Sequence, residues 1–149
     1  MHFPTKKKKW YTFLTGIIIT VLFLVFCSEV YYNMYSGDPE FDYEMESQNM
    51  YFVAAAFTVL LNWAFVSIFF LLWDPVDKRV MKWLIMLVVT LIFTPVVVFI
   101  YPDGEFASQN LDFSWQLKNF NIINVVVAFV LYIINSVAIN CFSNNNEFI

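Results

Sequence analysis

Charged residues are missing from four long parts of this sequence. No Asp, Glu, Lys, Arg or His occurs in residues 10–28, 51–73, 83–100 and 120–141. Each part has about the 17–25 residues that an α-helix needs to cross about 30 Å of hydrocarbon, and only segments that satisfy their own backbone hydrogen bonds can cross it. The sequence therefore predicts an all-α membrane protein, a single domain of residues 1–149 with four transmembrane helices at about residues 10–30, 51–73, 80–101 and 120–142.

The same absences exclude several classes of function. Proton pumps, ion-coupled carriers and voltage sensors need ionisable groups at membrane depth, and the four apolar runs contain none. The sole histidine, His2, cannot supply the paired histidines that hold haem in a membrane, and no Cys-x-x-Cys motif occurs. The three glycines form neither a phosphate-binding loop nor a nucleophile elbow. We therefore expect no enzyme activity, cofactor, metal or nucleic-acid partner.

The charges that are present predict an orientation in the membrane. Seven of the eight basic residues lie before the first run or around the middle loop: Lys6, Lys7, Lys8, Lys9, Lys78, Arg79 and Lys82. The eighth, Lys118, lies in one of the other two loops, which also carry nine of the twelve acids. Because positive charge favours the cytoplasmic side, both termini and the turn at residues 74–79 are predicted to be cytoplasmic. Cys27 and Cys141 then end their runs on opposite sides and cannot pair.

Two further features concern the origin of the chain and its first run. The first apolar run exceeds the 7–15 residues of a signal peptide and no small-x-small cleavage site follows it, so we expect it to remain as an anchor. The excess of Lys over Arg, with many Asn, Ile and Phe residues, suggests an AT-rich bacterial genome. The predicted location is therefore the bacterial inner membrane.

Each apolar run carries hydrogen-bonding side chains at helical spacing. The predicted intramembrane polar contacts are Thr20, Asn62, Thr90, Thr94, Asn124, Tyr132 and Asn135. Small and polar residues at three- and four-residue spacing let membrane helices approach and bond to one another, so Asn62 is expected to bond across the bundle. A second interpretation is a polar path for a neutral solute, which would need several copies because four helices leave no lumen. Pro95 predicts a kink in the third helix, with Thr94 satisfying freed backbone groups.

Two loops between the runs carry alternating patterns. From Asp38 to Glu46 every even position is acidic and every odd position is apolar or proline, which is typical of a half-buried strand. Residues 111–118 alternate in the same way, so the two segments are predicted to pair as a small β-ribbon. For the second segment a helix is the alternative, because four apolar side chains share a helical face: Phe106, Phe113, Leu117 and Phe120. A calcium loop is not favoured, because Tyr43 stands where that pattern requires Gly.

Two short signals predict where loops turn and helices begin. Asp74 followed by Pro75 predicts a helix N-cap and first-turn proline, and Pro102-Asp103-Gly104 predicts a turn. Phe41, Tyr43 and Met45, which alternate with the acids of the first loop, are of the residue types enriched in protein interfaces. The predicted partner-binding residues are Asp38, Glu40, Phe41, Asp42, Tyr43, Glu44 and Glu46.

These observations lead to a non-catalytic membrane subunit as the main functional hypothesis. Its predicted partners are the lipid bilayer and other membrane or extracytoplasmic proteins, or a second copy of the chain. One alternative is an immunity-type binder of a membrane toxin, because the chain resembles four-span immunity proteins in size without matching a motif. The other alternative is an oligomeric pore or carrier for a neutral solute, lined by Asn62, Asn124 and Asn135.

Overall fold

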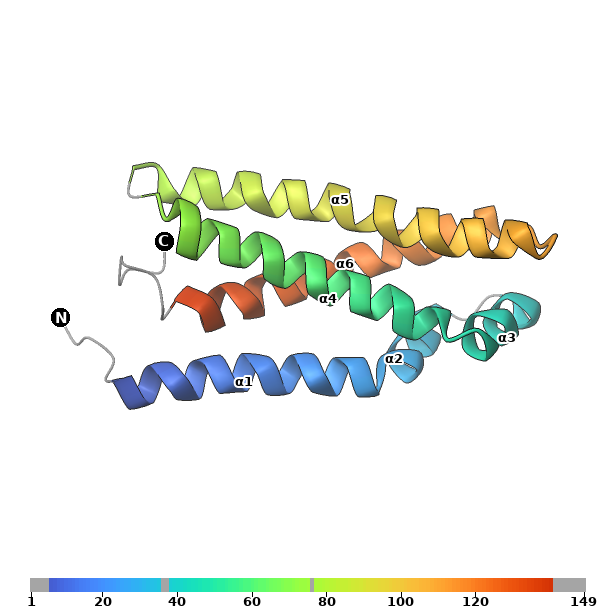
Figure 1. Ribbon diagram of the computed structural model, residues 1–149, viewed down its shortest axis with the longest axis horizontal. Helices are drawn as coiled ribbons and strands as arrows, with labels where there is room; N and C mark the ends of the chain where they lie inside the picture. Colours follow the sequence, from blue (N-terminus) through green and yellow to red (C-terminus); the bar gives the residue numbers. More distant parts are fainter. Residues whose placement is uncertain (1–5, 36–37, 76, 141–149) are drawn as a thin grey trace.

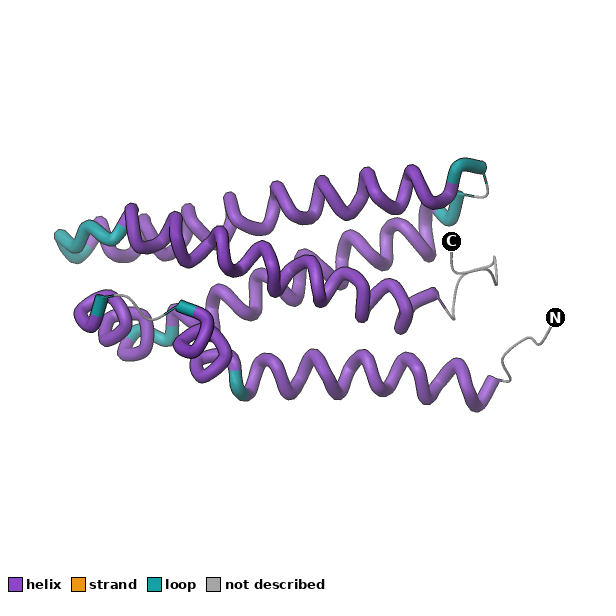
Figure 2. The backbone as a smooth tube through the Cα atoms, turned by 180° about the vertical axis from the view of Figure 1, so that it is seen from behind, coloured by secondary structure: helices purple, strands orange, loops and turns teal. Residues whose placement is uncertain are grey.

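The fold is helical throughout the part of the chain that the computed structural model describes, residues 6–35, 38–75 and 77–140. His2 and Cys141 lie outside these residues. The elements are α1 (Lys6–Val25), α2 (Cys27–Met34), α3 (Pro39–Ser47), α4 (Met50–Ser67), the π-helix η1 (Ile68–Trp73), α5 (Arg79–Ser108) and α6 (Ser114–Asn140). Figures 1 and 2 show these helices joined by short connections, with no strand among the described residues. The predicted β-ribbon is therefore wrong.

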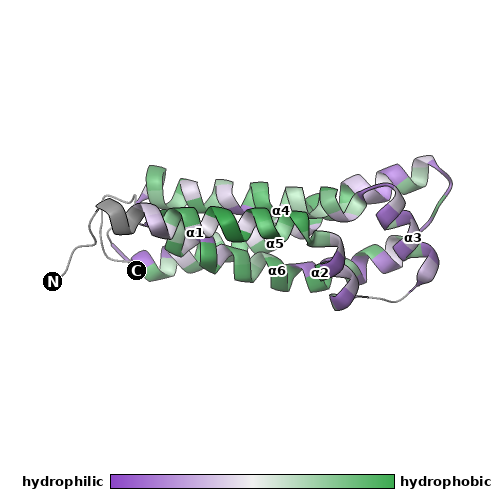
Figure 3. Ribbon diagram, turned by 90° about the horizontal axis from the view of Figure 1, so that it is seen from below, coloured by the Kyte–Doolittle hydropathy of each residue, from purple (hydrophilic) through white to green (hydrophobic). Residues whose placement is uncertain are grey.

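Three helices are long and apolar enough to cross a membrane. They are α4 together with η1 (Met50–Trp73), α5 and α6. The first apolar run instead forms a pair of helices, Trp10–Val25 and Cys27–Met34, with a bend of 70° between them. Counted as one broken span, this pair would be the fourth. Figure 3 shows hydrophobic residues along the long helices and hydrophilic residues gathered around α2 and α3.

Helix α6 lies at the centre of the arrangement. It packs against α1, α4 and α5, whereas α1 contacts only α4, α6 and its neighbour α2 closely (Figure 1). The contact between α1 and α6 depends on Gly16, because a Cβ at that position would lie 2.6 Å from the Cβ of Ala138. From Trp10 to Val25, where the side chains are described, most other α1 side chains are exposed, as expected for a helix that meets lipid on most sides.

The two ends of the bundle differ in charge. The basic end contains the start of α1 and the connection from η1 to α5, with Lys78, Arg79 and Lys82. The acidic end contains α2, α3 and the connection from α5 to α6. Nine acidic residues lie there: Glu29, Asp38, Glu40, Asp42, Glu44, Glu46, Asp103, Glu105 and Asp112.

At the acidic end the long helices continue past the predicted spans and carry their own hydrophobic core. Helix α5 has 30 residues, about 45 Å at 1.5 Å per residue, and therefore exceeds the hydrocarbon thickness of about 30 Å. Pro102-Asp103-Gly104 lies inside α5, so the predicted turn there is wrong, and the chain turns instead at Gln109 and Asn110, whose φ is 59°. Phe106 of α5, Phe113 of the connection, and Leu117 and Phe120 of α6 are all buried, but they come from separate elements, so the single helix proposed as the alternative for the second loop is also wrong.

The basic end is closed by a buried ion pair. The Arg79 guanidinium donates to Asp74 Oδ1 at 2.7 Å and to the Pro75 carbonyl at 2.8 Å, and it lies over the rings of Phe69 and Phe70. Asp74 has a φ of 40° and ends η1, and α5 begins only at Arg79. The predicted N-cap at Asp74 is therefore wrong. The carboxylate instead holds the turn by neutralising the arginine that begins the next helix.

Candidate functional site

The predicted partner-binding segment is a helix and not a strand. Asp38 is the N-cap of α3, its side chain accepts from the Glu40 backbone N–H at 3.0 Å, and Pro39 occupies the first turn. Acidic side chains in the first turn also favour a helix because they lie near the positive end of its dipole. Phe41 and Met45, four residues apart, are fully buried, whereas Tyr43 is 69% exposed. The expectation that these three side chains share one face is wrong.

The five acids of this segment also do not form one outward row. Three of them accept hydrogen bonds within the chain: Asp38 from Gln116 at 3.2 Å, Asp42 from the Tyr51 hydroxyl at 3.0 Å, and Glu44 from Gln48 at 2.7 Å. Glu40 and Glu46 are exposed, and their carboxylates have no hydrogen bond or ion pair within the described residues. These two are the acids of α3 that remain available to a partner.

Glu46 lines a pocket that the sequence did not predict. The pocket has a volume of about 380 Å³ and lies where α2, α3 and α4 meet, lined by Ser28, Glu29, Tyr32, Asn33, Glu46 and Tyr51. We call it the acidic pocket. Its two carboxylates come from different helices, Glu29 from α2 and Glu46 from α3. No ion pair within the described residues neutralises either of them, because the ion pair found there joins Asp74 to Arg79 at the basic end.

The residues of the acidic pocket suit recognition of a cation. Carboxylates accept from an ammonium or guanidinium group in strong charge-assisted hydrogen bonds, and the exposed ring of Tyr32 lines the same pocket, where it could make a cation–π contact. The volume lies in the range of small binding pockets. The lining contains no nucleophile paired with a base. Within the described residues, no group of three or more His, Cys, Asp or Glu side chains could hold a metal ion.

The polar residues of the apolar runs form a second set, and the structure places several of them in contact. Asn62 donates to the Ala128 carbonyl at 2.9 Å and accepts from Asn135 at 2.9 Å, so the expected bond across the bundle is present. Asn124 donates to Thr58 at 2.9 Å and accepts from the Tyr31 hydroxyl at 2.7 Å. These amides therefore bond to other parts of the same chain, whereas Asn135 Oδ1 is buried without a hydrogen bond.

The remaining predicted intramembrane residues have individual partners. Thr20 accepts from the Trp63 indole at 3.1 Å, and Tyr132 donates to the Trp83 carbonyl at 3.2 Å. Thr90 bonds within its own helix to the Met86 carbonyl. The hydroxyl of Thr94 is buried without a hydrogen bond, so the expectation that it satisfies backbone groups freed by Pro95 is wrong. The whole set therefore lies inside the bundle, and most of its bonds end on α6.

Sequence reasoning missed Glu29, Tyr32 and Tyr51 as members of a site. The bend of 70° between α1 and α2 directs Glu29 toward α3, yet no proline or glycine occurs near the bend to reveal it. The one local signal is the change from apolar to polar residues at Ser28 and Glu29. Tyr51 carries no local signal, because its role depends on contact with Asp42 nine residues earlier.

Comparisons with protein-family models, with curated proteins and with solved structures find no significant match to this chain. The geometry of the described residues is therefore the basis for any functional assignment.

Proposed function

We propose that this chain is a non-catalytic integral membrane subunit that docks a partner protein by receiving a basic side chain in the acidic pocket. The partner is a membrane or extracytoplasmic protein that presents Lys or Arg. The observation that carries the proposal is the pair of carboxylates of Glu29 and Glu46, which line one pocket and have no cation within the described residues. A cation of matching size would gain charge-assisted hydrogen bonds there.

The proposed setting is a four-span topology in a bacterial inner membrane, with the acidic end outside. The three long apolar helices and the bent pair α1–α2 supply enough length for four crossings. The basic residues cluster at one end and nine acids at the other, which supports a cytoplasmic basic end. The pocket would then open on the extracytoplasmic side. There its negative charge would attract a basic partner, and the distance over which it does so would shorten as the ionic strength rises.

A charge-matched pair of variants tests the docking proposal. Glu29→Gln/Glu46→Gln removes two charges from the acidic pocket, and Asp103→Asn/Glu105→Gln removes two charges from the end of α5 outside it. We expect a protein that co-purifies with the wild type in mild detergent to be retained by the α5 variant and lost from the pocket variant. High salt should cause the same loss. Equal loss from both variants would indicate a general charge effect, and equal retention would contradict the proposal.

The topology is tested separately with reporters. A reporter that is active only outside the cytoplasm should be active when inserted after Gln109, between α5 and α6, and silent when fused after Ile149. The opposite pattern would place the acidic pocket in the cytoplasm and remove the proposed setting, whatever the result of the docking experiment.

A further inference from the structure

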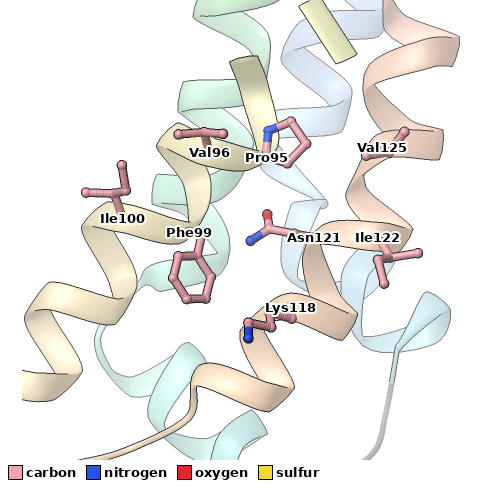
Figure 4. A pocket seen from close by; sticks show the side chains of 8 residues that line it. All are labelled: Pro95, Val96, Phe99, Ile100, Lys118, Asn121, Ile122 and Val125. Atoms are coloured by element: carbon pink, nitrogen blue, oxygen red, sulfur yellow. The ribbon is translucent and has the colours of Figure 1, made fainter. Parts of the chain in front are cut away.

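A second hollow lies between α5 and α6, away from the acidic pocket (Figure 4). Its volume is about 470 Å³, and it is lined by Pro95, Val96, Phe99, Ile100, Lys118, Asn121, Ile122 and Val125. Most of these side chains are aliphatic or aromatic, and two are polar. The hollow is a groove whose surface is almost entirely apolar, with Lys118 and the buried amide of Asn121 beside it, so it suits a ligand with a hydrocarbon part.

The amide of Asn121 is the unusual feature of this groove. Asn121 is 5% exposed, and neither its Nδ2 nor its Oδ1 has a hydrogen-bond partner. Figure 4 shows the carboxamide directed into the hollow, toward α5. A buried polar group without a hydrogen-bond partner is unfavourable. By contrast, the buried amides of Asn62 on α4 and Asn124 on α6 both make hydrogen bonds. The unpaired Nδ2 donor of Asn121 therefore calls for a ligand that accepts a hydrogen bond.

Lys118 adds a charge to the same groove. It lies three residues before Asn121, so both project from the same face of α6. Lys118 is exposed, is the one basic residue at an end that carries nine acids, and makes no ion pair within the described residues. Along about 10 Å of α6, the lining thus changes from the cation of Lys118 to the amide of Asn121 and then to the apolar side chain of Val125.

We infer that this groove binds one anionic phospholipid. The phosphate pairs with Lys118, an ester carbonyl about one turn deeper accepts from the Asn121 amide, and an acyl chain lies along Phe99, Pro95 and Val125. The order of charge, polar linkage and hydrocarbon in the groove matches the order of these groups across one leaflet of a bilayer. The inference rests on the proposed membrane location of the chain.

A lipid fits this groove better than a protein helix. The rim of the groove is formed by Val96, Ile100 and Ile122, which are exposed and would face acyl chains in a bilayer. A second copy of this chain would also need to bring an anion to Lys118 and an acceptor to Asn121.

Native mass spectrometry of the full chain in mild detergent tests the inference. Phosphatidylglycerol supplies the phosphate and ester groups, and phosphatidylcholine with the same acyl chains is the neutral comparison. We expect the wild type to retain one phosphatidylglycerol per chain in preference to phosphatidylcholine. Asn121→Leu and Lys118→Gln should each reduce that retention about tenfold or more, because each removes a hydrogen bond or charge contact to the ligand. Lys82→Gln, at the basic end, should leave it unchanged.

Thermal unfolding in lipid-free micelles separates loss of the ligand from loss of the fold. Asn121→Leu removes an unpaired buried amide, so it should unfold at the same or a higher temperature than the wild type, while added phosphatidylglycerol should no longer stabilise it. Equal retention of both lipids by the wild type, or phosphatidylglycerol retention by Asn121→Leu, would overturn the inference. So would a mass showing a dimer that Asn121→Leu dissociates. The reporter experiment tests the membrane location independently, so either idea can fail alone.

Discussion

Replacing Asn62 with Leu is the most direct test of how the bundle is held together. Leu has a similar volume but removes both hydrogen bonds of the amide, the one donated to the Ala128 carbonyl and the one accepted from Asn135. Hydrogen bonds between membrane helices contribute about 0.6 kcal/mol on average and at most about 1.7 kcal/mol each. We therefore expect Asn62→Leu to lower the free energy of unfolding by about 1–3 kcal/mol.

A double-mutant cycle isolates the bond between the two amides. Either single change leaves the other asparagine buried without this partner, and Asn135 Oδ1 already lacks one. The double variant Asn62→Leu/Asn135→Leu should consequently be less destabilised than the sum of the single variants, by about 0.6–1.7 kcal/mol. Asn33→Leu, a matched change at an exposed position of α2, should stay within about 0.5 kcal/mol of the wild type.

The assay is reversible unfolding in mixed micelles with increasing SDS, followed by tryptophan fluorescence, because Trp63 and Trp83 make hydrogen bonds between helices. The reasoning would be refuted if the two changes were additive within about 0.3 kcal/mol. A destabilisation of Asn62→Leu as small as that of Asn33→Leu would also contradict it. Either result would mean that the bond seen at 2.9 Å contributes no net stability.

Three other perturbations have defined outcomes. Gly16→Ala should destabilise the packing of α1 on α6 by about 1–3 kcal/mol, and adding Ala138→Gly should restore part of it in the same unfolding assay. Asp74→Asn should lower the free energy of unfolding by about 3–5 kcal/mol, because it removes the carboxylate that neutralises the buried guanidinium of Arg79, and Asp74→Leu/Arg79→Met should recover most of the loss. The pKa of Asp112 is lowered by hydrogen bonds from the backbone N–H and, to a lesser extent, the hydroxyl of Ser114. The contribution of these bonds to stability is therefore present above the unfolded-state pKa of about 3.9 and is lost as pH falls through the lower folded-state value. Amide exchange in the first turn of α6 should therefore rise below about pH 4 in the wild type, and Asp112→Asn should remove that pH dependence.

The apolar helices could be predicted because their information is local. Residues 51–73, 83–100 and 120–141 are mostly apolar and contain no charged residue, and the structure has a long helix over most of each. The paired amide of Asn62 could also be expected, because a polar group amid hydrocarbon side chains is stable only with a partner.

The first loop shows how a correct pattern can lead to a wrong structure. Its alternation of acids and apolar residues matches a strand, yet Asp38, Pro39 and the acids that follow also match a helix start. In a helix only Phe41 and Met45 share a face, and both pack into the hydrophobic core of the acidic end. Nine residues hold too few periods to separate the two interpretations, and packing decided between them. The acidic pocket could not be predicted, since it depends on a bend that no local residue marks.

The central position of α6 has a consequence for how the protein is made. Asn62 finds its partners at Ala128, 66 residues later in the chain, and at Asn135, 73 residues later. At a synthesis rate of about 5–20 residues per second, the amide waits roughly 3–13 s before its first partner has been made. During that time the Asn62 side chain has neither of the two hydrogen-bond partners that it has in the folded bundle. The nascent chain therefore depends on water, or on the insertion machinery, to shelter this side chain until its last helix arrives.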